Sequence, residues 1–169
     1  MSGTSAPDLS AQLSSAGKRL AIVASRFNSA IVDRLVAGAY EAVSKTGGDA
    51  NNVSLFHCPG AWELPQVTAQ LLDKGFDAII AFGCVIRGET AHFDFVAGHA
   101  SDGLGALARK SRVPILFGVL TTETLEQAIA RADREAGNKG YEVTLSALEL
   151  IALFERIAHL PRATGSGAP

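Results

Sequence analysis

Four short apolar runs, separated by helix-length segments, constrain the fold of this chain more than any other feature. The runs are nearly continuous in apolar residues, which is typical of strands buried on both faces of a parallel sheet; they cover 19–25, 52–57, 77–83 and 113–120. Apolar residues recur at helical spacing in the segments 29–47, 63–75, 92–111, 121–137 and 141–160. The alternation predicts an α/β protein with three layers, in which a four-stranded parallel sheet lies between helices.

The chain length of 169 residues is typical of one domain, and a hydrophobic content of 47% is enough to build a core. We expect a single domain at 19–160. The Ser-, Ala- and Gly-rich residues 1–18 are predicted to form a flexible N-terminal arm, and 161–169 a flexible C-terminal tail. A net charge of −2 argues against a broad nucleic-acid-binding face.

The sequence also argues against a membrane or secreted location. No apolar run approaches the ~20 residues needed to cross a bilayer, and residues 1–18 lack the apolar block of a signal peptide. The expected location is therefore the cytoplasm. Cys58 and Cys84 do not form a C-x-x-C pair and are predicted to be small buried thiols.

The residues themselves favour neither a metal site nor a dinucleotide-binding loop. His92 and His99 share one face of a predicted helix, but seven residues separate them by ~10 Å along its axis, so one metal ion cannot bind both. The glycine pattern at 103–108 resembles a dinucleotide-binding motif but falls inside a helix. It is therefore interpreted as a site of close helix packing.

The candidate ligand-binding residues follow the strands, because ligands of open parallel sheets bind beyond the carboxyl ends of the strands. Phe27 and Trp62 lie in such segments, where an aromatic ring can stack on a flat ligand or can simply close the end of the sheet. Residues 88–90 precede a helix, so their backbone N–H groups can bind an anion, although this spacing also fits an ordinary helix cap. His92, in the first helical turn, can transfer protons near neutral pH or can be structural.

Five motifs make the pattern specific. They are RFN at 26–28, PGAWELP at 59–65, GCVIRGETAHFDFV at 83–96, FGVLTT at 117–122 and AGNKG at 136–140. Together they resemble the lumazine synthase family over residues 20–157. The resemblance implies a flavodoxin-like fold and the condensation of 5-amino-6-(D-ribitylamino)uracil with 3,4-dihydroxy-2-butanone 4-phosphate. An imine forms first, and phosphate elimination, ring closure and dehydration then give 6,7-dimethyl-8-ribityllumazine, an intermediate of riboflavin biosynthesis, without a cofactor.

The resemblance also assigns roles to residues at the ring end of the site. Phe27 stacks on the pyrimidine, and the ribityl chain is bound by Ala61, Trp62 and Glu63. Backbone groups of Cys84, Val85 and Ile86 bind the polar edge of the ring. The family often has Phe in place of Trp62 and a small or hydroxyl residue in place of Cys84.

A second group of residues is implied at the phosphate. Thr90 and the backbone of Glu89 bind the phosphate, and His92 is the proton donor. Arg131 pairs with the phosphate, since a guanidinium can bond two oxygens at once, and Lys139 is a weaker candidate. Phe117 comes from the neighbouring subunit.

The resemblance implies a homopentamer, with a site at each interface between subunits. Some family members assemble twelve pentamers into an icosahedral shell, and the short link at 131–139 favours such a shell. Two other functions share this scaffold: a lumazine- or riboflavin-binding protein, and an enzyme that joins two lumazines. The first needs neither His92 nor Arg131, and the second needs no phosphate site, so these residues favour the synthase.

Overall fold

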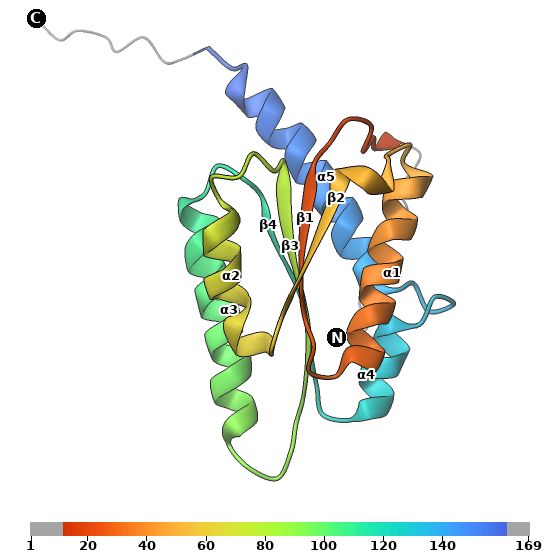
Figure 1. The fold of residues 1–169 in the computed structure, drawn as a ribbon, viewed down its shortest axis with the longest axis vertical. Helices are drawn as coiled ribbons and strands as arrows, with labels where there is room; N and C mark the ends of the chain where they lie inside the picture. The colour runs from red at the N-terminus through yellow and green to blue at the C-terminus, as the bar shows by residue number, and fades with distance from the viewer. Residues whose placement is uncertain (1–11, 162–169) are drawn as a thin grey trace, which may run out of the picture.

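The computed structural model describes residues 12–161, which form a four-stranded sheet covered by helices on both faces (Figure 1). All strand pairs are parallel, in the order β2-β1-β3-β4. The strands are β1 (Leu20–Ser25), β2 (Val53–Cys58), β3 (Ala78–Ile86) and β4 (Ile115–Thr122). The predicted three-layer α/β architecture with a parallel sheet is confirmed.

The helices form two unequal layers, as Figure 1 shows. One face of the sheet is covered by α1 (Ser29–Lys45), α4 (Leu125–Ala132) and α5 (Lys139–Ala158), and the other by α2 (Leu64–Leu71) and α3 (His92–Lys110). Short 3-10 turns, η2 (Ala50–Asn52) and η3 (Ala61–Glu63), precede β2 and α2. Each layer encloses its own apolar cluster, because successive strand residues point to opposite faces.

Strand β3 is longer than the sequence predicted. The apolar run ends at Gly83, yet β3 continues to Ile86, because residues 83–86 pair with residues 119–122 of β4. Pairing with β1 stops earlier, at Ala24 and Phe82. The last residues of β3 therefore extend past β1, and their backbone on that side is not engaged by the neighbouring strand.

Part of the predicted N-terminal arm packs on the domain. Ser15 is buried; its hydroxyl donates a hydrogen bond to the Val43 carbonyl oxygen (2.9 Å) and lies 2.6 Å from the Thr46 hydroxyl. These contacts attach residues 12–18 to the end of α1. The remainder of the arm and nearly all of the predicted tail lie outside the described residues. No helix of residues 12–161 is both long and apolar enough for a membrane span.

Candidate functional site

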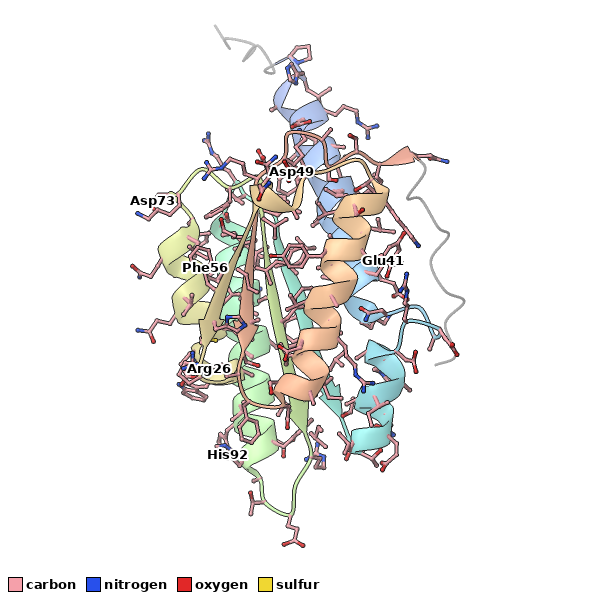
Figure 2. All side chains as sticks on the ribbon, turned by 45° about the vertical axis from the view of Figure 1, so that its right-hand side comes forward. Arg26, Glu41, Asp49, Phe56, Asp73 and His92 are labelled. Atoms are coloured by element: carbon pink, nitrogen blue, oxygen red, sulfur yellow. The ribbon has the colours of Figure 1, made fainter. Side chains whose placement is uncertain are left out.

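A cavity of about 610 Å³ lies where the sequence predicts a ligand, at the carboxyl edge of the sheet. Its walls come from the segments after β1, β2 and β3 and from the start of α3. They comprise Phe27, Pro59, Gly60, Ala61, Trp62, Glu63, Cys84, Val85, Ile86, Gly88, Thr90, His92, Phe93 and Val96. In Figure 2, Arg26 and His92 lie at this end of the molecule, whereas Asp49 and Asp73 lie at the other.

The segment after β1 is held in place by hydrogen bonds to both neighbouring strand ends. The backbone N–H of Phe27 donates to the Pro59 carbonyl oxygen (3.0 Å). Asn28 adopts a left-handed conformation (φ 58°), and its side-chain amide donates to the Cys84 carbonyl oxygen (2.8 Å). The backbone is thus fixed, while the Phe27 ring remains 70% exposed. An exposed ring on a fixed backbone is suited to stacking on a flat ligand.

The segment after β2 presents Trp62 on a short turn. The Gly60 backbone N–H donates to a carboxylate oxygen of Glu63 (2.8 Å), which closes the turn. The Trp62 ring is 48% exposed and stacks on His99 of α3, with ring centroids 3.7 Å apart and planes 13° apart. Glu63 therefore has one oxygen engaged in the fold, and Trp62 has one face covered.

The end of β3 supplies backbone rather than reactive side chains. Cys84 is buried, and burial raises the pKa of its thiol to about 11. The pKa of the Cys58 thiol is also raised, chiefly by burial and further by nearby Glu63. Both thiols are free and stay protonated near neutral pH. The prediction that both cysteines are small buried thiols is confirmed. The polar groups that this part of β3 presents are therefore backbone groups, of which the Cys84 carbonyl oxygen already accepts from the Asn28 amide.

The loop between β3 and α3 is anchored by Arg87. Its guanidinium pairs with Asp94 (3.1 Å) and Glu123 (2.8 Å) and lies over the Phe93 ring, 4.1 Å from the centroid. The hydrogen bonds to Asp94 and then to Glu123 raise the pKa of Arg87. The loop is thereby fastened to both α3 and the start of the β4–α4 connection.

The start of α3 has the features of an anion site. The helix is preceded by Ala91, which has no capping side chain, and the Thr90 hydroxyl accepts only a long hydrogen bond from the His92 N–H (3.4 Å). A Cβ placed on Gly88 would meet no atom within 4 Å, so the backbone there is open to a ligand. The Asp94 N–H donates to the Ala91 carbonyl oxygen (3.0 Å). N–H groups at a helix start that lack such partners favour phosphate, and exposed His92 stands at this start.

Four predicted site residues do not line this cavity. Glu89 is exposed, and Phe117 is 42% exposed on β4, at the edge of the sheet. Arg131 is exposed on α4, where its guanidinium donates to the Gln127 carbonyl oxygen (3.2 Å). Lys139, at the start of α5, pairs with Glu142. A single chain therefore brings together nine of the thirteen predicted residues.

Sequence reasoning missed several residues of the site. Phe93 and Val96 line the cavity, and the signal for Val96 was its position four residues after His92 on the same helical face. Asn28 belongs to the RFN motif, but the sequence alone assigns it no role. Within residues 12–161, no group of three His, Cys, Asp or Glu side chains is arranged to hold a metal ion.

The fold and the cavity together define a class. A parallel sheet in the order 2-1-3-4, with a ligand cavity beyond its carboxyl edge, is the arrangement of flavodoxin-like α/β proteins that bind small molecules. Comparison with known proteins narrows this class to one family. The family profile of 6,7-dimethyl-8-ribityllumazine synthase matches residues 17–155, and the chain belongs to that family.

Individual relatives agree with the family match. The chain is 48% identical to 6,7-dimethyl-8-ribityllumazine synthase of Aquifex aeolicus over 147 residues, which cover 86% of this chain and 96% of the relative. It is 45% identical to the protein of that name from Chlorobium chlorochromatii and 46% identical to that from Chlorobaculum parvum. Each of these two matches spans 146 residues, or 86% of this chain and 94% of the relative.

Proposed function

We propose that the protein is a 6,7-dimethyl-8-ribityllumazine synthase. It condenses 5-amino-6-(D-ribitylamino)uracil with 3,4-dihydroxy-2-butanone 4-phosphate and releases phosphate and water. Family membership supports this function, and one structural observation carries it furthest: a single cavity gathers stacking rings, the end of strand β3, an uncapped helix start and a histidine. These are the groups needed to hold a flat diamine beside a phosphorylated ketone.

The diamine is proposed to bind at the Phe27 and Trp62 side of the cavity. Phe27 stacks on the pyrimidine, and the backbone of residues 84–86 bonds the polar edge of the ring. The turn at 61–63 binds the ribityl chain. This assignment is supported by the position of β3, whose last residues extend beyond β1 and line the cavity; the Cys84 carbonyl oxygen there already accepts a hydrogen bond from the Asn28 amide.

The ketone phosphate is proposed to bind at the start of α3. Backbone N–H groups of residues 88–90 and the Thr90 hydroxyl hold the phosphate, while exposed Glu89 contributes only its backbone. Imine formation requires a proton on the departing carbonyl oxygen, and phosphate elimination requires a proton taken from carbon. His92, one helical turn from the phosphate donors, moves these protons. Most of the acceleration comes from holding the two reactants together.

The four residues outside the cavity are proposed to complete it across a subunit boundary. Phe117 is an exposed aromatic residue on an edge strand, as expected of a side chain that covers a neighbour's ligand. Arg131 and Lys139 belong to α4 and α5, apart from the cavity of their own chain. We propose a homopentamer with a site at each interface, and twelve pentamers in a shell. Two free thiols are consistent with the proposed cytoplasmic location.

The function is tested by mixing purified protein with both substrates. The expected result is the absorbance of the lumazine, with one phosphate released for each lumazine formed. A protein that binds the lumazine but releases no phosphate would instead be a binding protein on this scaffold. Light scattering measures the mass of the assembly and distinguishes a pentamer from a sixty-subunit shell.

A further inference from the structure

One face of α3 lines part of the cavity with its first turns and continues past it. His92, Val96, His99 and Gly103 lie within a ~60° arc of this helix, because their spacing of four, three and four residues follows its turn. The first two line the cavity. Gly103 packs so closely on α2 that a Cβ there would come within 2.7 Å of the Pro65 ring. His99 lies between these two contacts.

The contact that His99 makes is with a ligand-facing residue. Its imidazole lies almost parallel to the Trp62 indole, 3.7 Å between ring centroids, yet His99 itself does not line the cavity. The close approach at Gly103 fixes the distance between α3 and the η3–α2 segment. His99 therefore covers one indole face and leaves the remaining surface of the ring toward the cavity.

We propose that His99 is a positioning residue, which holds the Trp62 ring in the orientation that binds the flat or ribityl-bearing part of the ligand. The inference rests on the proposed function for the identity of that ligand. Trp62 is half exposed and is the middle residue of a turn of only three residues, so the stacked His99 ring is a direct restraint on its side chain. A stacked aromatic pair adds stabilisation to that gained from burying the two rings. Here the pair fixes a ring that forms part of the cavity wall.

The chain offers a direct probe, because Trp62 is its only tryptophan. Intrinsic fluorescence and its quenching by acrylamide therefore report the accessibility of this one ring without any substrate. His99→Ala and His99→Gln remove the stacked ring, and His99→Phe restores a flat one. We expect the acrylamide quenching constant to rise by up to about twofold in the first two variants, since one of two faces is uncovered, and to return toward wild type in His99→Phe.

The functional measurement is the split between KM and kcat. We expect His99→Ala and His99→Gln to raise KM for the diamine, and Kd for 6,7-dimethyl-8-ribityllumazine titrated by Trp62 fluorescence, by about 2- to 10-fold. The kcat should remain within about twofold, because His99 touches neither reacting group. The His99→Phe variant should recover most of the affinity. The matched control is His159→Ala, an exposed histidine at the end of α5, and it should change none of these values.

The outcomes separate this inference from the proposed function. Unchanged quenching and unchanged ligand affinity in His99→Ala would overturn the positioning role, as would a failure of His99→Phe to restore affinity. Wild-type protein that binds the lumazine but does not form it would overturn the synthase function, while the fluorescence and Kd measurements would still decide the role of His99. A melting temperature equal to wild type in each variant excludes a general loss of folding.

Discussion

Asn28 offers a sharp test of how the cavity is held open. It occupies the position before α1, where an asparagine side chain usually caps the helix, but it makes no such bond. Its amide instead reaches the Cys84 carbonyl oxygen, 2.8 Å away, and joins the β1–α1 connection to the end of β3. The residue also adopts φ 58°, a conformation that asparagine and glycine accept more readily than alanine.

Because of these two features, substitution by glycine and substitution by alanine should lower the free energy of unfolding by different amounts. Asn28→Gly keeps the conformation and removes the hydrogen bond, which costs about 1 kcal/mol, with about 0.5–1 kcal/mol more for the freer unfolded chain. Asn28→Ala removes the same bond and adds about 1–2 kcal/mol for an L-residue in the left-handed region. We therefore expect destabilisation of about 2 kcal/mol for Gly and about 2–3 kcal/mol for Ala.

Thermal unfolding measures the difference at one fixed protomer concentration, since an oligomer's melting temperature depends on concentration. For a chain of this size, 1 kcal/mol corresponds to about 2–4 °C. Both variants should also raise KM for the diamine, because Phe27 adjoins Asn28. Asn51→Gly, in exposed η2, serves as the control. A melting temperature unchanged in Asn28→Gly, or lower in Asn28→Gly than in Asn28→Ala, would refute the reasoning.

Three further predictions concern the chemistry, the phosphate and the thiols. His92→Ala should lower kcat by about 10²–10⁴-fold with little change in melting temperature, since the side chain is exposed; steady-state kinetics with undiminished turnover would remove His92 from the mechanism. Gly88→Ala should fold normally, because its Cβ meets nothing within 4 Å, yet raise KM for the ketone phosphate by about tenfold, because the backbone N–H remains but the added methyl takes up space that the phosphate needs beside it; an unchanged KM would contradict this anion site. The pKa of Cys84 is about 11 in the fold and about 8.5–9 in the unfolded chain, so only the unfolded state loses this proton at intermediate pH. Stability measured in urea should therefore fall between pH 9 and 11, less steeply in Cys84→Ala, and equal slopes would argue against burial as the cause.

The layers of the fold could be predicted because the central strands β1 and β3 are buried on both faces and are therefore apolar nearly throughout. The edge strands β2 and β4 carry similar runs, although each keeps exposed residues, such as Phe56 and Phe117. The end of β3 could not, because residues 83–86 pass through a glycine and a cysteine before the polar loop, and only their pairing with β4 defines them as strand. The order of the strands is also a property of packing between distant segments. No local pattern in residues 20–25 specifies which two strands will flank them.

The site could be predicted where residue type and position at a strand end carry the information, as for Phe27, Trp62 and His92. His99 illustrates the limit. The sequence placed it on the same helical face as His92, but its partner is 37 residues earlier, and nothing local indicates that α3 approaches that turn so closely. The contribution of Phe117, Arg131 and Lys139 likewise stays a prediction, because it depends on a second chain.

The hydrogen bonds that tie Phe27 to Pro59 and Asn28 to Cys84 have a thermodynamic consequence for ligand capture. The segments after β1 and β2 and the end of β3 are already joined before any substrate arrives, so little backbone ordering remains to accompany binding. Calorimetry of lumazine binding should then give a modest negative heat-capacity change, set by the apolar surface that the ring and the indole cover. A much larger negative heat-capacity change would mean that these segments become ordered only when the ligand binds.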